Sequence, residues 1–226
     1  MKAIDIRNLT FSYNNKDIIL EDISLSVEEG ESIGLVGLSG NGKSTLCHII
    51  AGIIPNVIPG HINGYVGLFG RDILKLNLPF VSQIAAIVFQ NPETQLFSPT
   101  VEDELAFAAE NLCLDRPEIK KRIDSALEIV GMKDFLLENP NNLSGGQMQL
   151  IAIASVLTLQ PQIMIFDEVN SQLDKEGRER VTDVIKHLKK LGKTIIMIDH
   201  DIQNLNLMNN IIVLKNKKLC QYVGEL

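Results

Sequence analysis

The segment of the chain with the clearest chemical character has the composition of a phosphate-binding loop. It fits the pattern G-x-x-x-x-G-K-[ST], and its residues are Gly37, Leu38, Ser39, Gly40, Asn41, Gly42, Lys43, Ser44 and Thr45. In such a loop, backbone N–H groups surround the phosphates, the lysine reaches the β- and γ-oxygens, and the next hydroxyl is a ligand of Mg²⁺. The alternative is a glycine-rich turn that precedes a lysine by chance. The four fixed positions of the pattern should occur together by chance in only about one per cent of chains this long. The sequence therefore predicts a site for nucleotide phosphates.

Three further strand-like runs end in polar residues. Asp167 closes one run, where it could hold Mg²⁺ beside Ser44, and Glu168 follows it, where it could polarise an attacking water. Ordinary strand-end polarity is the alternative for this pair. Gln90 and His200 end the other two runs, and each alone is more typical of a structural residue than of a catalyst.

A second glycine-containing segment, 143–147, predicts the start of a helix. Ser144 is a good N-cap, and Gly145 and Gly146 leave the backbone bare ahead of Gln147. Such a helix start would suit a γ-phosphate brought by another subunit. A plain helix-capping turn is the alternative.

The elements that must position these residues predict an α/β fold. The run 32–37 predicts a buried strand and 44–50 the helix after it, so that the N-terminus of this helix faces the phosphates. Strands that alternate with helices indicate a P-loop core with a mainly parallel sheet and the chemistry at its carboxyl ends. The remaining strands are expected as an N-terminal antiparallel layer and a closing hairpin, at 3–9, 18–27, 62–69, 211–214 and 219–223.

One domain that spans 1–226 is expected, with a helical lobe inserted at 91–160. Within it, Thr100 caps a helix, and Asp103 takes the place where Glu or Gln usually completes a capping box. The apolar spacing predicts the buried face of that helix as Val101, Leu105, Ala108 and Leu112.

Composition narrows the class of protein. The chain has 226 residues, a formal charge of −7, 5% aromatic residues and no Trp, which argues against a nucleic-acid partner. The scattered cysteines Cys47, Cys113 and Cys220 are expected to be reduced and packed. The longest apolar stretch, 150–159, is too short to span a bilayer.

With these residues in order, the sequence resembles the ATPase domain of ABC transporters over its whole length. The phosphate loop resembles the Walker A motif, 163–167 with Glu168 resembles Walker B, and 143–147 resembles the LSGGQ signature. Gln90 stands at the Q-loop position, 171–174 at the D-loop, and His200 at the switch histidine.

The resemblance implies ATP and Mg²⁺ as cofactors and assigns roles. Asp167 and Gln90, with Ser44, would hold the metal, Glu168 would orient the water, and His200 would contact the γ-phosphate. Tyr13, which alone is more typical of a half-buried turn aromatic beside 14–15, would stack on adenine.

Within the family, 88–97, 100–107 and 171–174 resemble the ATPases of energy-coupling-factor (ECF) importers of vitamins and metal ions. The resemblance implies a motor subunit at the cytoplasmic face of a membrane-embedded subunit, whose basic segment would dock near Gln90 and 102–104. It also implies a second ATPase domain, paired head to tail so that each ATP lies between one Walker A and the other signature. A heterodimer is preferred and a homodimer is the alternative.

Some positions depart from the family pattern and leave a second hypothesis open. Val169 and Asn170 replace the usual Pro-Thr, Leu150 replaces the usual Arg, and Asn216-Lys217 replaces a common glycine turn. The chain also ends without the C-terminal extension of many ECF ATPases. These departures would suit a regulatory or hydrolysis-poor nucleotide-binding module. A DNA-acting ABC protein has no support, because 90–143 lacks a long coiled-coil insertion.

Overall fold

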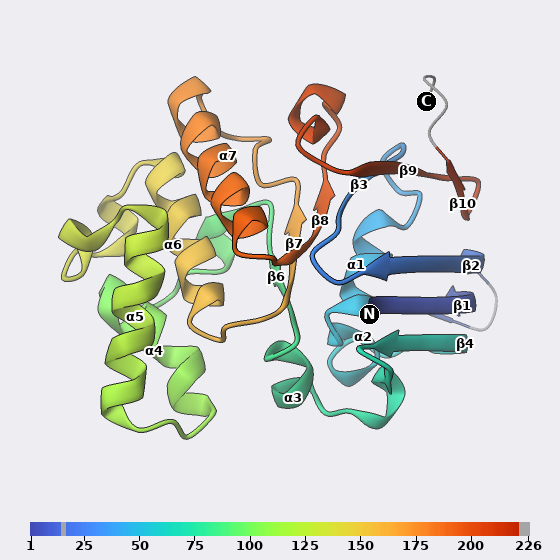
Figure 1. Cartoon of the computed structure of the whole chain (residues 1–226), viewed down its shortest axis with the longest axis horizontal. Coiled ribbons are helices and arrows are strands. Elements are labelled where there is room, and N and C mark those ends of the chain that lie inside the picture. The colour runs from blue at the N-terminus through green and yellow to red at the C-terminus, as the bar shows by residue number, and fades with distance from the viewer. Residues whose placement is uncertain (15–16, 222–226) are drawn as a thin grey trace.

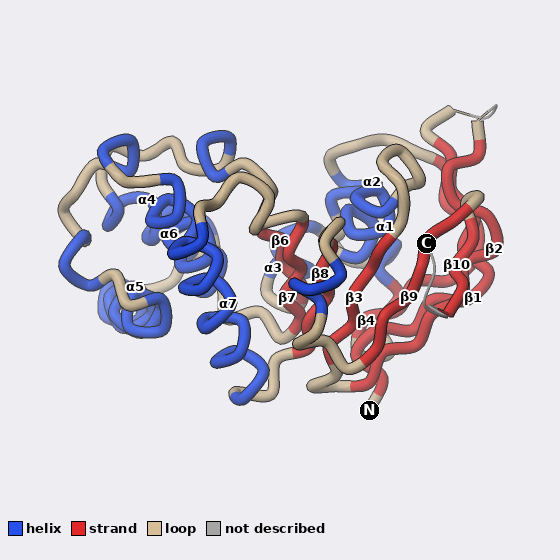
Figure 2. Tube along the Cα trace, turned by 90° about the horizontal axis from the view of Figure 1, so that it is seen from above, coloured by secondary structure: helices blue, strands red, loops and turns tan. Residues whose placement is uncertain are grey.

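Two β-sheets form the strand-rich part of the molecule (Figures 1 and 2). The computed structural model describes residues 1–14 and 17–221. The smaller sheet is antiparallel and has the strand order β2-β1-β4-β5. Its strands are β1 (Lys2–Ser12), β2 (Ile18–Glu28), β4 (His61–Leu68) and β5 (Arg71–Asp72). This sheet is the predicted N-terminal layer, although Asn15 of the turn between the first two strands lies outside the described residues.

The larger sheet has the order β10-β9-β3-β8-β7-β6 and is parallel except for β10. Its strands are β3 (Ser32–Val36), β6 (Ala85–Val88), β7 (Ile163–Asp167), β8 (Thr194–Ile198), β9 (Asn210–Lys215) and β10 (Lys218–Gln221). Every residue of β3, β6, β7 and β8 is buried, as expected for parallel strands covered on both faces. The α/β prediction is confirmed. Val223, expected in the last strand, lies outside the described residues.

The register of this sheet aligns the carboxyl ends of its central strands. Leu35 of β3 pairs with Ile198 of β8, which in turn pairs with Asp167 of β7. On the other side of β7, Phe166 pairs with Val88 of β6. The residues that follow these strands therefore meet at one edge of the sheet.

The longer helices lie at one end of the molecule and beside the sheet (Figures 1 and 2). The helices are α1 (Lys43–Ile50), α2 (Ile53–Asn56), α3 (Leu78–Ser82), α4 (Val101–Asn111), α5 (Arg116–Val130), α6 (Gly145–Leu157) and α7 (Lys175–Lys190). Every described element between residues 91 and 160 is helical. Among the described residues, no helix combines the length and apolarity that a bilayer span requires.

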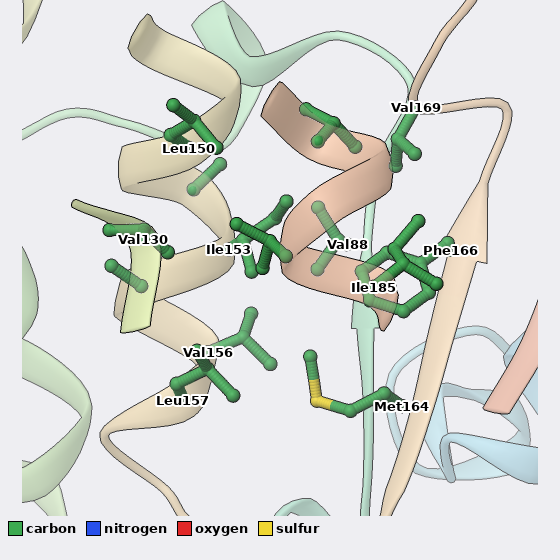
Figure 3. Packing of buried hydrophobic residues seen from close by; sticks show 14 of the residues in the cluster. Val88, Val130, Leu150, Ile153, Val156, Leu157, Met164, Phe166, Val169 and Ile185 are labelled. Atoms are coloured by element: carbon green, nitrogen blue, oxygen red, sulfur yellow. The ribbon is translucent and has the colours of Figure 1, made fainter. Parts of the chain in front are cut away.

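The hydrophobic core consists of two clusters on opposite faces of the parallel sheet. Successive residues of β7 alternate between them, with Met164 and Phe166 in one cluster and Ile163 and Ile165 in the other. The first cluster includes α6 and α7, and Figure 3 shows Phe166 beside Ile185 of α7. The second includes α1 and the antiparallel sheet. The sheet thus carries α6 and α7 on one face and α1 on the other.

Two details of the predicted packing are wrong. Helix α4 buries Val101, Leu105 and Ala109, whereas Ala108 and Leu112 are only partly buried. The reason is that the i, i+4, i+8 row, rather than the expected mixed spacing, faces the core. Of the cysteines, Cys47 alone is buried among the described residues, and Cys113 and Cys220 are free but exposed.

The start of α4 also differs from the expected capping box. Thr100 caps the helix by accepting from the N–H of Asp103. The Asp103 carboxylate does not reach back to the backbone; it accepts from the Thr100 hydroxyl at 2.6 Å. Aspartate is one methylene shorter than the glutamate of a capping box, which explains the local contact.

The sequence places Glu104 on the surface that docks a partner, and this prediction is wrong. Glu104 is only 5% exposed, so its carboxylate is not available to a partner. Its Oε2 atom accepts from the N–H groups of Phe97 and Ser98 at 2.9 and 2.8 Å. The carboxylate thereby fixes the segment that leads into α4. Glu102 and Asp103, by contrast, are exposed.

We expect Glu104→Ala to lower the free energy of unfolding by about 1–3 kcal/mol, because two backbone donors lose their acceptor. Glu102→Ala is the matched control and should cost at most about 1 kcal/mol, the value of one acid in the first turn of a helix. Denaturant unfolding of both variants measures the difference. Equal stabilities would show that Glu104 does not support this segment.

Candidate functional site

The phosphate loop joins β3 to α1, and α1 leaves its N-terminus unoccupied by side chains. Its N-cap is Gly42, which makes no side-chain cap, and its first turn holds no acidic residue. The helices α4 to α7, by contrast, are capped by Thr100, Asp115, Ser144 and Asp174. The N–H groups of the first turn of α1 are therefore free to bind an anion.

Strand β9 sets the path of the loop. A Cβ atom at Gly37 would lie 2.3 Å from the Leu214 carbonyl oxygen, so no other residue fits there without moving the backbone. The side-chain amide of Asn41 donates to the same oxygen at 3.2 Å. Within the loop, Ser39 and Gly40 are exposed. The loop is thus held from one side and open on the other.

Lys43 lies inside the loop and is 5% exposed. Its Nζ atom donates to the carbonyl oxygens of Gly37 at 2.9 Å and of Leu38 at 3.3 Å. A phosphate oxygen could replace these neutral acceptors with a stronger, charge-assisted bond. Ser44, the next residue, is exposed.

Tyr13 lies against the helix that follows the loop. Its hydroxyl is 3.0 Å from Thr45 Oγ1, and its ring packs edge-on against Phe11 with centroids 4.9 Å apart. Because 42% of Tyr13 is exposed, part of its ring is available to a ligand. Stacking on adenine stays a prediction.

Glu168 and His200 meet at the aligned strand ends. Glu168 Oε1 is 2.6 Å from His200 Nε2, although the two residues follow different strands. The backbone turns sharply after β7, with a φ of 52° at Glu168, and the Glu168 N–H donates to the Ile198 carbonyl. A positive φ at a non-glycine residue is strained and typical of functional sites.

His200 also shares open space with the phosphate loop. A cavity of ≈ 340 Å³ is lined by His200 together with Gly37, Ser39 and Asn41 of the loop. A group bound on the loop would therefore lie within reach of the histidine.

Gln90 follows β6 at the same edge of the sheet. Its side chain is exposed, and its Nε2 atom donates to Ser171 Oγ at 3.2 Å. Ser171 begins the segment expected to act as the D-loop. The structure thus brings Gln90, Glu168 and His200 to the edge at which the phosphate loop begins.

Asp167 has the surroundings of a cation ligand. The residue is 8% exposed, and within residues 1–14 and 17–221 no cationic side chain forms an ion pair with it. Its charge affects its neighbours: burial lowers the pKa of His48, and Asp167 opposes that shift. Burial raises the pKa of Cys47, and Asp167 adds to the increase. A buried carboxylate without a cation suits a bound Mg²⁺ ion.

The described residues contain no cluster of three or more His, Cys, Asp or Glu side chains that could hold a metal ion. Mg²⁺ is usually bound through one or two protein oxygens together with substrate phosphates and waters, rather than by a cage of side chains. The donor set of Asp167, Ser44 and Gln90 therefore fits Mg²⁺ that arrives with a nucleotide.

The polar residues and the glycines of the second glycine segment, 143–147, have different roles. Ser144 and Gln147 form a capping box: the Ser144 N–H donates to Gln147 Oε1 at 2.9 Å, and the Gln147 N–H donates to Ser144 Oγ at 3.3 Å. A Cβ atom on Gly146 would lie 3.1 Å from the Cα atom of Gly177 in α7, whereas Gly145 faces open space. Gly145 is thus the glycine available to a ligand, and Gly146 permits close helix packing.

This segment lies far from the phosphate loop of the same chain. In Figures 1 and 2, α6 and α1 are on opposite sides of β6, β7 and β8. The structure therefore does not bring Ser144, Gly145, Gly146 and Gln147 together with the other predicted site residues.

Leu150 and Val169, two of the departures from the family pattern, occupy packed positions, whereas Asn216 and Lys217 are exposed. Leu150 is 1% exposed and Val169 is buried in the same cluster, as Figure 3 shows. The turn at Asn216-Lys217 reaches the positive φ values of 50° and 67° without glycine, and the Lys217 carbonyl accepts from the Glu21 N–H.

Asn170 has a partner that the sequence analysis missed. Its buried side-chain amide donates to Asp199 Oδ2 at 3.5 Å, and Asn204 donates to the same oxygen at 2.9 Å. Asp199 immediately precedes His200, so these contacts hold the strand end that carries the histidine. The one signal in the sequence was a carboxylate next to His200 at the end of an apolar run.

The chain is similar to known proteins over most of its length. The sequence model of a family described as ABC transporter matches residues 20–171. An ABC transporter ATP-binding protein of Pyrococcus abyssi is 43% identical over 203 residues, which are 89% of this chain and 72% of that protein. The energy-coupling factor transporter ATP-binding protein EcfA1 of Mycoplasmoides gallisepticum is 39% identical over 217 residues, which are 96% of this chain and 76% of that protein.

A solved structure is similar over nearly the same span. The structure of cbiO1 from Clostridium perfringens, part of the ABC transporter complex cbiONQ, matches with a TM-score of 0.86 and 30% identity. The match covers 97% of this chain and 87% of that chain.

We expect Leu150→Arg, which restores the usual family residue, to lower the free energy of unfolding by about 3 kcal/mol or more, because it places an unpaired charge in the core. Leu150→Met keeps the volume and should cost less than about 1.5 kcal/mol. Thermal unfolding with an ATPase assay tests both variants. A stable Leu150→Arg protein with faster turnover would show that the position serves the signature segment.

Proposed function

The chain belongs to the ABC transporter family of ATPases, which couple ATP hydrolysis to transport, and on that basis we propose that it is the motor subunit of an ECF-type importer of a vitamin or a metal ion. The observation that carries this proposal is the identity of 39% with an energy-coupling factor ATP-binding protein over 96% of the chain. The similarity to cbiO1, which is part of a transporter complex, supports it. The subunit would act at the cytoplasmic face of the membrane, bound to a membrane-embedded partner.

The residues around the loop suggest how ATP is held. The free N–H groups of α1 and the Lys43 ammonium would bind the phosphates, the lysine exchanging its bonds to Gly37 and Leu38 for phosphate oxygens. Ser44, Asp167 and Gln90 would hold Mg²⁺, which neutralises charge on the transferred phosphoryl group when bound. Tyr13 would stack on the adenine.

Glu168 and His200 would divide the work at the γ-phosphate. Glu168 would orient the attacking water by accepting its hydrogen bond. In the structure, His200 Nε2 lies 2.6 Å from Glu168 Oε1, so the histidine takes the place that the water would need. We expect His200 to leave this carboxylate for the γ-phosphate when ATP binds, so that the same oxygen becomes available to the water.

A second ATPase domain would complete the site. The separation of α6 from α1 in Figures 1 and 2 supports this, because Gly145 is open to a ligand but lies away from the loop of its own chain. The proposal takes a second, different ATPase domain as the partner, and a second copy of this chain is the alternative. Because the Leu150 side chain is buried, it gives no reason to expect that this chain's signature segment serves ATP less well than the signature of the second domain.

The surface near α4 is the proposed contact with the membrane subunit. Phe97 and Phe107 are exposed, and their rings pack edge-on with centroids 4.8 Å apart. Glu102 and Asp103 add exposed negative charge to the same helix. An amphipathic, basic segment of the partner would match this combination.

A regulatory module that binds ATP but hardly hydrolyses it is the second candidate. Its support was the set of departures at Leu150, Val169 and Asn170. Leu150 and Val169 are packed in the core, the Asn170 amide donates to Asp199, and Glu168 and His200 are both in place. These observations favour the hydrolysing motor.

We expect Glu168→Gln to bind ATP but to lower turnover by at least about a hundredfold, because the phosphate contacts survive while the water loses its basic acceptor. Phosphate release and the ATP dissociation constant are the two measurements. Lys43→Ala is the contrasting variant and should lose ATP affinity. Normal turnover of Glu168→Gln would remove Glu168 from this role, and equally poor turnover of the wild type would favour the regulatory module.

We expect Glu102→Lys with Asp103→Lys to release the membrane subunit and to leave ATP binding unchanged, because the substitutions reverse an exposed charge away from the loop. Co-purification of the membrane subunit with the variant measures the contact. Glu110→Lys, at an exposed position near the end of the same helix, is the matched control. A complex that survives the double reversal would leave Glu102 and Asp103 only as stabilisers of the helix start.

A further inference from the structure

Phe89, the residue between β6 and Gln90, has both of its backbone polar groups bonded by glutamine side chains. Its N–H donates to Gln95 Oε1 at 3.3 Å, and its carbonyl oxygen accepts from Gln149 Nε2 at 3.3 Å. β6 is the edge strand of the sheet, and Phe89 lies just beyond Val88, the last residue of β6 that pairs with β7. Here two side chains fix the direction in which the chain leaves the sheet.

Both glutamines connect this strand end to α6. Gln149 is itself a residue of α6 and is 0% exposed. Gln95 belongs to the segment after Gln90, and its Nε2 atom donates to the carbonyl oxygen of Ala152 in α6 at 3.2 Å. We call Gln95 and Gln149 the glutamine clamp. It joins the residue before Gln90 to the helix that begins with the signature segment.

Only half of the Gln149 amide is hydrogen-bonded. Its Oε1 atom is buried and has no hydrogen-bond partner among the described residues. Its neighbours in α6 are Leu150, Ile151 and Ala152, all buried in the core. Because an unpaired buried acceptor is unfavourable, an apolar side chain of the same length would suit this position better if packing were its only task.

We propose that Gln95 and Gln149 are positioning residues that make Gln90 and the signature segment move as one unit. The proposal rests on the proposed roles of the two segments: Gln90 serves the ATP on this chain's own loop, and Gly145 faces the ATP of the second domain. The clamp then links two ATP sites, because a shift of α6 against one nucleotide displaces Gln90 at the other. Packing supports such transmission, since Val88 at the end of β6 and Ile153 of α6 belong to the same core cluster (Figure 3).

The test replaces each amide by a side chain of the same length without one, Gln149→Met and Gln95→Met. We expect kcat for ATP to fall by about tenfold to a hundredfold, the effect of a catalytic group displaced by about an ångström. KM should stay within about twofold, because the phosphate loop is untouched. The melting temperature of Gln149→Met should stay close to that of the wild type, because the loss of the unpaired acceptor offsets the loss of the donor to the Phe89 carbonyl. The measurement uses the full chain purified together with its partner subunits.

Two further variants separate positioning from a general structural effect. Gln83→Met is the control. Gln83 also donates from Nε2 to a backbone carbonyl, that of Pro79, but it lies at the C-terminus of α3, outside the glutamine clamp. It should leave kcat unchanged. Gln95→Glu keeps an oxygen for the Phe89 N–H but loses the donor to Ala152, so it should resemble Gln95→Met if the link to α6 is what matters.

The proposal is overturned if the clamp variants keep the kcat of the wild type, or if their kcat falls only in proportion to a lower melting temperature. It is also overturned if Gln95→Glu has full activity while Gln95→Met does not, since satisfaction of the Phe89 N–H would then suffice. The proposed function fails separately, through normal turnover of Glu168→Gln.

Discussion

The parallel register of β3, β8, β7 and β6 is the constraint on which the rest of the site depends. Because Leu35, Ile198 and Asp167 lie side by side across three strands, the residues that follow each strand emerge at one edge. A shift of one residue in any pairing would turn alternate side chains to the opposite face. It would also separate Glu168 from His200, whose contact at 2.6 Å joins two strands. The two hydrophobic clusters fix this register from both faces.

Much of this arrangement could be predicted because its signals are local. Glycine at fixed spacing, an apolar run that ends in a carboxylate, and a serine ahead of a helix each act over a few residues, and all proved to mark real elements. The positions of Gln90, Glu168 and His200 at strand ends followed from the same signals. Their placement next to one another needed one more rule, that the carboxyl ends of parallel strands share an edge.

The remainder could not be predicted, because it depends on neighbours that only the folded structure brings together. The sequence predicts Glu104 as a surface acid, but its carboxylate turns inward to the N–H groups of Phe97 and Ser98. Asn170 departs from the family pattern, and its amide donates to Asp199, 29 residues further along the chain. Leu150 stands where the family usually has Arg, but its surroundings are those of the core. In each case the residue type was visible, and its neighbours were not.

We propose that one chain alone holds an incomplete ATP site, because its signature segment lies across the sheet from its phosphate loop (Figures 1 and 2). The most direct test is the ATP turnover per chain, measured over a dilution series with the mass in solution followed in parallel. We expect the turnover per chain to fall on dilution as assemblies dissociate, or to be negligible until a second ATPase domain is added. Constant turnover per chain in a sample shown to be monomeric would contradict it.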